Sequence, residues 1–126
     1  MPTIVKVGQQ QMALYRATAK RRWEQEQPEL ARRRERAWQV ARHAASMLRD
    51  RFGATRVVAF GSLVHPNCFT RWSDVDIAAW GIRPQDTFRA IGTALDTDSE
   101  LEVNLVDVGA YRPEVLAAIE QGGVDL

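Results

Sequence analysis

Two stretches of the sequence decide the fold: Val57-Val58-Ala59-Phe60-Gly61-Ser62 and Ser73-Asp74-Val75-Asp76-Ile77-Ala78-Ala79-Trp80. Each holds a short apolar run next to turn-forming residues, which is the pattern of a buried strand. Side chains alternate between the two faces of a strand, so Asp74 and Asp76 share one face and the apolar residues occupy the other. The sequence therefore predicts two strands, the second of which carries two carboxylates on one face.

The two carboxylates and the upstream Gly-Ser turn together predict a metal and nucleotide site. Same-face neighbours on a strand lie roughly 6.5–7 Å apart, so Asp74 and Asp76 repel each other unless a cation lies between them. Oxygen ligands suit Mg²⁺ or Mn²⁺. The Gly61–Ser62 turn offers backbone N–H groups and a hydroxyl, which bind phosphate. The alternative is a plain turn followed by a strand entered through a polar turn, but it does not explain Asp76, which lies inside the apolar run.

At these residues the chain resembles the minimal nucleotidyltransferases of the DNA polymerase β superfamily. The resemblance covers about residues 50–126 and includes the later acidic strand Glu102-Val103-Asn104-Leu105-Val106-Asp107-Val108. It implies a polymerase-β-like α+β fold in which Asp74 and Asp76 bind two divalent cations, Mg²⁺ or Mn²⁺. It also implies that Gly61 and Ser62 contact the phosphates of a nucleotide, ATP in the first instance, and we include Ser73 among the nucleotide-binding residues.

The third carboxylate of the resembled site is where this chain departs from the pattern. The family pattern is close to Val-Asp-Leu-Val-Asp, and this chain has Asn104 at the position of the expected ligand. A neutral amide oxygen is a poorer partner for Mg²⁺. Glu102 shares the Asn104 face, whereas Asp107 has the opposite parity and is expected to face away. Three alternatives stay open: Glu102 completes the site, Asn104 does so directly, or the metal that activates the attacking hydroxyl is weak or absent.

Composition places the chain among ordinary globular proteins. It has 126 residues, 45% of them hydrophobic, so we expect one compact unit with a single core. The single cysteine, Cys68, excludes an internal disulfide, and two histidines with one cysteine do not make a conventional zinc site. Because we find neither a secretory signal nor a long apolar run, we expect a cytoplasmic protein without a membrane segment.

The net charge of +1 conceals a strong asymmetry along the chain. Residues 1–56 hold 13 Lys and Arg against 5 Asp and Glu, whereas residues 57–126 hold 4 against 11. In the basic part, helical spacing of apolar residues predicts two helices, 9–27 and 29–51, with Pro28 as the break between them. We therefore expect an N-terminal helical extension over 1–52, folded as a hairpin, before a nucleotidyltransferase core over 53–126.

The remaining elements alternate. The patterns predict a helix that begins at Asp86 as its N-cap and carries Phe88, Ile91 and Leu95 on one face, and a second that begins at Pro113 and ends before Gly122. They predict strands over 56–60, 74–80 and 101–108. A small mixed sheet with helices makes an α+β fold.

Three classes of function are compatible with these patterns. The first is a nucleotidyltransferase that moves a nucleoside monophosphate, AMP from ATP, to a hydroxyl. The second is an interaction protein with poor turnover, because the resemblance extends to antitoxins that pair with a helical toxin of the HEPN type. The third is a nucleic-acid-binding protein that uses the basic helices. Large aromatic residues among the arginines, Tyr15, Trp23 and Trp38, are typical of interfaces, so we expect a homo-oligomer or a helical partner; the alternative is a monomer whose helices pack on its own sheet.

Overall fold

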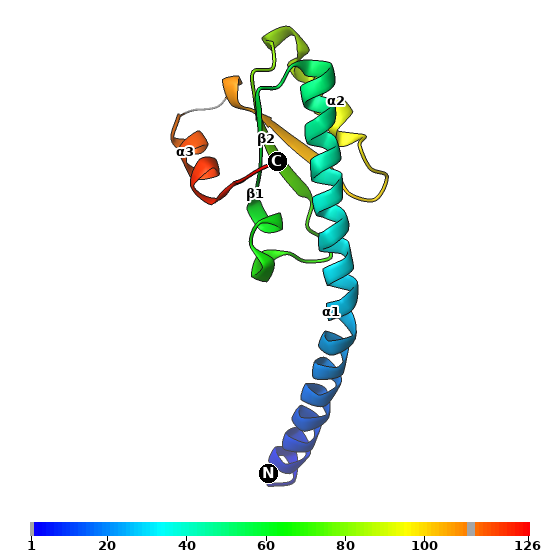
Figure 1. The fold of residues 1–126 in the computed structure, drawn as a ribbon. Coiled ribbons are helices and arrows are strands. Elements are labelled where there is room, and N and C mark those ends of the chain that lie inside the picture. The colour runs from blue at the N-terminus through cyan, green and yellow to red at the C-terminus, as the bar shows by residue number, and fades with distance from the viewer. Residues whose placement is uncertain (1, 111–112) are drawn as a thin grey trace. The chain divides into compact units, whose positions relative to one another are not determined.

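The N-terminal part of the chain is one helix, not a hairpin. In the computed structural model, which describes residues 2–110 and 113–126, helix α1 extends over Pro2–Phe52 with Pro28 inside it (Figure 1). The expected break at Pro28 is therefore wrong. A proline removes one backbone hydrogen bond and costs about 3 kcal/mol, but no glycine accompanies it here. The surrounding Glu, Gln, Arg and Ala residues are strong helix formers, so the helix continues past the proline.

Two compact units divide the chain, Met1–Arg32 and Arg33–Leu126. The first is helical, and the side chains of Met12, Leu14 and Tyr15 are largely exposed in it. The side chain of Trp23 lies outside the described residues. The second unit contains the C-terminal part of α1 and the entire sheet. None of the described helices combines the length and apolar character needed to cross a bilayer.

A four-stranded mixed sheet forms the centre of the second unit, which confirms the α+β class. Its strands are β1 (Arg56–Phe60), β2 (Val75–Trp80), β3 (Val103–Asp107) and β4 (Val124–Asp125), in the spatial order β3-β2-β1-β4. Strand β1 is antiparallel to β2 and β4, and β2 is parallel to β3. The predicted strands thus form where the apolar runs lie, shortened at some of their ends.

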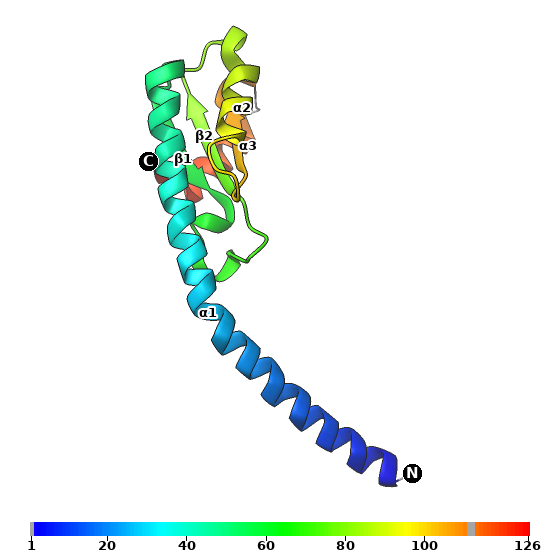
Figure 2. The same cartoon turned by 90° about the vertical axis from the view of Figure 1, so that its right-hand side faces the viewer.

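Helices cover both faces of the sheet. The C-terminal part of α1 and helix α2 (Thr87–Leu95) lie on one side, and α3 (Pro113–Gly122) lies on the other (Figures 1 and 2). Ala37, Ala41 and Ala44 of α1 are fully buried, and such small side chains allow a helix to approach a sheet closely. On the opposite face, Ile119 of α3 packs with Val58 and Ala78. Each fully buried Val, Leu or Ile contributes about 1.5–3 kcal/mol to folding.

Helix α2 buries a different face from the one that the sequence predicts. Ala90 and Ala94 are buried, whereas Phe88 is 89% exposed. The small residues face inward because α2 packs directly on β3. Asp86 stands at the N-cap position but makes no capping hydrogen bond, since its carboxylate binds Arg83 and Arg89 instead. These two ion pairs explain how Asp86 can be buried although it is not part of the candidate site.

Candidate functional site

The Gly-Ser turn begins where β1 ends. Gly61 has a φ of +75°, and the short 3₁₀ helix η1 (Gly61–Leu63) follows, held by the buried side chain of Leu63. The backbone N–H groups of Val64 and His65 donate to the carbonyls of Gly61 and Ser62, each at 3.3 Å. Only glycine adopts this backbone conformation without strain. A β-carbon at Gly61 would also lie 2.8 Å from Oδ2 of Asp76, so the Asp76 carboxylate occupies the space beside Gly61 that a side chain would need.

Asp76 is the centre of the site. It lies opposite Phe60 of β1 and opposite Asn104 of β3, and its side chain is half-buried. Burial raises the pKa of the Asp76 carboxyl above its ordinary value; the hydrogen bond from Asn104 offsets part of this rise, and the negative charge of Asp74 adds to it. The protein surroundings of Asp76 therefore stabilise its charged carboxylate poorly. A bound cation would stabilise this charged form.

Asp74 and Ser73 lie just before β2. The turn that leads to them is closed by Ser73, whose hydroxyl accepts a hydrogen bond from the Thr70 N–H at 2.8 Å and whose own N–H donates to the Thr70 carbonyl at 3.0 Å. Asp74 is half-buried, and its charge acts on Asp76 as expected for same-face neighbours. The Ser73 hydroxyl is already engaged in the turn, so its role as a nucleotide contact stays a prediction.

Asn104 and Asp107 of β3 lie on opposite faces of the sheet, as their positions in the strand predict, and Asn104 is the one beside Asp76. Nδ2 of Asn104 donates a long hydrogen bond of 3.4 Å to Oδ1 of Asp76. Glu102 is exposed just before β3, and its backbone carbonyl accepts a hydrogen bond from the Val75 N–H at 2.9 Å. Asp107 is buried on the other face, where it accepts a hydrogen bond from the Thr87 hydroxyl at 2.6 Å. Asp107 is thus outside the site, as predicted.

Oxygen-bearing side chains lie beside the Gly61–Ser62 turn. The carboxylates of Asp74 and Asp76 and the amide of Asn104 carry oxygen atoms, and Mg²⁺ and Mn²⁺ prefer oxygen ligands. At position 61 only glycine leaves room for the Asp76 carboxylate, because a β-carbon there would lie 2.8 Å from Oδ2 of Asp76. Within the described residues, no group of three or more His, Cys, Asp or Glu side chains is placed to hold a metal ion.

Three consecutive arginines of α1, Arg32, Arg33 and Arg34, make contacts that could not be assigned from the sequence. Arg34 donates from Nε and Nη2 to the Leu63 carbonyl at 3.1 and 2.9 Å, and Arg33 donates from Nη2 to the Ser73 carbonyl at 3.2 Å. Both residues are half-buried, whereas Arg32 is exposed. The only sequence signal was that three consecutive arginines cover most of a helical turn, so that they point in different directions.

Comparison of the sequence with known protein families and with curated proteins gave no match in either case.

Proposed function

We propose that the chain is a metal-dependent nucleotidyltransferase that moves a nucleoside monophosphate from a nucleoside triphosphate to a hydroxyl group. One observation carries this proposal: the carboxylate of Asp76 lies directly against Gly61 of the Gly61–Ser62 turn. A cation ligand and a phosphate-binding turn in contact are what a metal-bound triphosphate requires. Strand pairing also places Asn104 opposite Asp76, and Asp74 is near enough for its charge to act on the Asp76 carboxyl.

In this reaction the hydroxyl oxygen forms a bond to the α-phosphorus, and the bond from that phosphorus to the oxygen bridging to the β-phosphate breaks. Pyrophosphate leaves with the electron pair, and the hydroxyl proton passes to water. Asp74 and Asp76 would hold the divalent cations, which when bound neutralise the charge that develops on the entering and leaving oxygens. The Gly61–Ser62 turn would orient the β- and γ-phosphates through its N–H groups and the Ser62 hydroxyl. The protein's share of the chemistry is therefore positioning and charge.

Turnover depends on the residue opposite Asp76. Asn104 donates an N–H to Asp76, so its amide is oriented as a hydrogen-bond donor to a metal ligand. This orientation supports a weakened nucleophile-side metal more than direct coordination by Asn104. Glu102 is exposed two residues earlier, just before β3, and its carboxylate remains the candidate for the third ligand.

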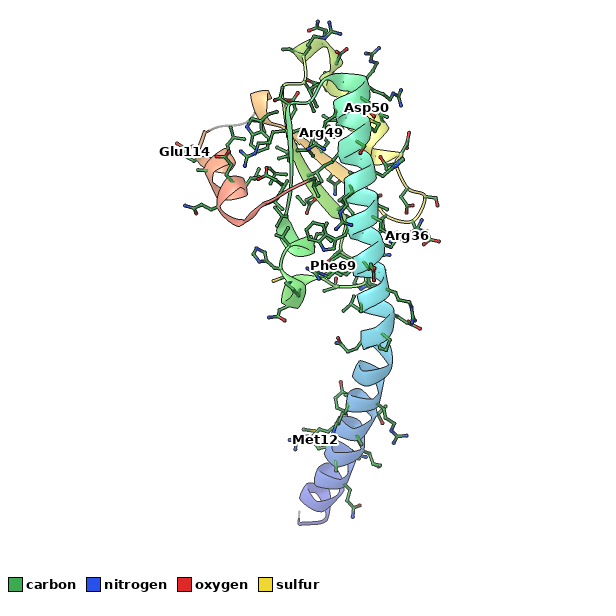
Figure 3. The ribbon with its side chains drawn as sticks, in the orientation of Figure 1. Met12, Arg36, Arg49, Asp50, Phe69 and Glu114 are labelled. Atoms are coloured by element: carbon green, nitrogen blue, oxygen red, sulfur yellow. The ribbon has the colours of Figure 1, made fainter. Side chains whose placement is uncertain are left out.

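Calorimetry with Mn²⁺ and a non-hydrolysable ATP analogue tests the proposal. We expect weak binding of Mn²⁺ alone and tighter binding with the nucleotide, because the triphosphate adds oxygen ligands. Asp76→Asn should remove the metal-dependent part of the binding. Asp50→Asn is a matched control, because it removes one exposed carboxylate from α1, away from the site (Figure 3). Equal binding by the wild type and Asp76→Asn would show that the site assignment is wrong.

A second candidate function is partner binding through the N-terminal unit. Leu14 and Tyr15 are 70% and 72% exposed on α1, and exposed large apolar side chains favour an interface. A second copy or a helical partner of the HEPN type would fit this role, and such binding is compatible with catalysis. Capture of a HEPN-type protein by the full chain, and its loss in Leu14→Glu, is the expected result; an equal capture by Leu14→Glu would place the contact elsewhere.

Nucleic-acid binding is the third candidate. Arg33, Arg34 and Arg36 of α1 all bind acceptors of the chain itself, which leaves fewer cations for phosphates than the sequence suggested. If the remaining cations bind nucleic acid, the affinity should fall steeply with salt because counterions are released. The absence of a retarded complex at low salt would remove this candidate.

A further inference from the structure

Three arginines of α1 reach the three segments that form the site. Arg34 binds the Leu63 carbonyl in the turn after β1, and Arg33 binds the Ser73 carbonyl just before Asp74. Arg36 binds the carboxylate of Asp98 at 2.6 Å, in the loop that leads to β3 (Figure 3). Because β2 and β3 are parallel and β1 is antiparallel to them, the end of β1 and the starts of β2 and β3 lie at one edge of the sheet. The arginines thus contact all three segments at that edge.

The geometry of the contacts restrains the segments that these arginines bind. Two N–H groups of Arg34 converge on one carbonyl, which fixes the direction of the guanidinium, and the ring of Trp38 lies 6.0 Å from it. Asp98 also accepts hydrogen bonds from the N–H groups of Glu100 and Leu101, so Arg36 is joined to the backbone that enters β3. The buried Nε–H of Arg33 has no hydrogen-bond partner within the described part of the chain.

We propose that Arg33, Arg34 and Arg36 are positioning residues that hold the turn after β1, the lead into β2 and the lead into β3 in register with one another. The distance between Gly61 and the Asp76 carboxylate is then set partly by α1, not only by strand pairing. The link to nucleotide binding rests on the function proposed above. The positioning itself does not, and it can be measured in the protein without any ligand.

Hydrogen exchange of single backbone amides in the full chain tests the positioning. The N–H groups of Val64 and His65 report on the first turn, that of Ser73 reports on the second segment and that of Leu101 reports on the third. Substitution of one arginine should speed exchange about tenfold in its own segment, because charged hydrogen bonds are lost there, and leave strand amides of β1 and β2 unchanged.

The variants are chosen to separate geometry from charge. Arg34→Lys keeps the charge but lacks the fork that binds one carbonyl twice, so exchange at Val64 and His65 should rise in it nearly as much as in Arg34→Ala. Arg33→Lys keeps a cationic N–H donor for the one bond to the Ser73 carbonyl, so it should restore the protection at Ser73 that Arg33→Ala loses. Arg42→Ala is the matched control, because Arg42 is an exposed arginine of the same helix whose described contact is the ring of Trp38.

Binding of Mn²⁺ with the ATP analogue, measured where every variant is folded, completes the test. We expect affinity to fall about tenfold in Arg34→Lys and Arg33→Ala but not in Arg42→Ala, because misplaced ligands bind the metal poorly. Unchanged exchange in all segments, or equal changes in Arg42→Ala, would overturn the proposal. Segment-specific exchange changes in a protein that binds no nucleotide would instead uphold the positioning and refute the proposed function.

Discussion

The substitution Gly61→Ala tests how closely the Asp76 carboxylate lies to Gly61, provided that its effect is distinguished from the backbone strain that any residue with a β-carbon has at a positive φ. Gly61 has a φ of +75° and would place a β-carbon 2.8 Å from Oδ2 of Asp76. A residue with a β-carbon costs about 1–2 kcal/mol in this backbone conformation. The forced contact adds about 0.5–1.5 kcal/mol, because the Asp76 carboxylate, at the end of its side chain, must rotate away from the turn and from Asn104. The expected loss in free energy of unfolding is therefore about 1.5–3.5 kcal/mol.

The chain contains a matched control for this substitution. Gly53 has a φ of +70°, and a β-carbon built there meets no atom within 4 Å. Gly53→Ala should therefore lose only the backbone part, about 1–2 kcal/mol. Urea denaturation gives both free energies of unfolding, and calorimetry gives the affinity for Mn²⁺ with the ATP analogue.

Binding should be lost in Gly61→Ala and kept in Gly53→Ala, because only the first displaces a metal ligand. Equal destabilisation of the two variants would show that Asp76 does not lie against the turn. Full nucleotide binding by Gly61→Ala would refute the reasoning that connects this contact to the site.

Three further predictions address the ligands and the N-terminal unit. If the nucleophile-side metal is weak, Asn104→Asp should raise the rate of nucleotidyl transfer about tenfold, which corresponds to about 1.4 kcal/mol of barrier. If Glu102 already serves as the third ligand, Glu102→Gln should abolish transfer and Asn104→Asp should change the rate little. Transfer assays with labelled ATP distinguish the two cases. Because the folded pKa of Asp76 is raised, the folded state retains the proton longer than the unfolded state, so metal-free stability falls as pH rises from the ordinary carboxyl range through the raised pKa. Asp76→Asn should remove this dependence in urea titrations at several pH values and stabilise the metal-free protein at neutral pH; a steeper dependence would contradict the sign. Light scattering at micromolar concentration should show association that Leu14→Glu and Tyr15→Glu abolish, and a full-length chain that stays monomeric and binds no helical partner would refute it.

The sequence alone predicted the strands β1, β2 and β3 and the opposite faces of Asn104 and Asp107 in β3. Short apolar runs are stable only when they are buried. Because side chains alternate along a strand, the buried residues then fix the face of every other residue in that strand. For that reason Asp74 and Asp76 were predicted on one face and Asp107 on the other, and the structure places Asp107 in a hydrogen bond with Thr87. The departure at Asn104 was visible only by comparison with the pattern of the resembled family, and parity then placed Glu102 on the Asn104 face.

Only the tertiary structure decided how the helices are used. The continuation of α1 through Pro28 was not predictable, because the local cost of proline competes with the helix propensity of a long flanking sequence. The inward face of α2 depends on its close packing against β3, which favours Ala90 and Ala94 over the larger Phe88. The arginine contacts join residues about 30–60 positions apart, as from Arg34 to Leu63 and from Arg36 to Asp98, and no local pattern specifies such pairs. Strand periodicity is a local property of the chain, whereas these contacts exist only once the helix, the turn and the loops have packed together.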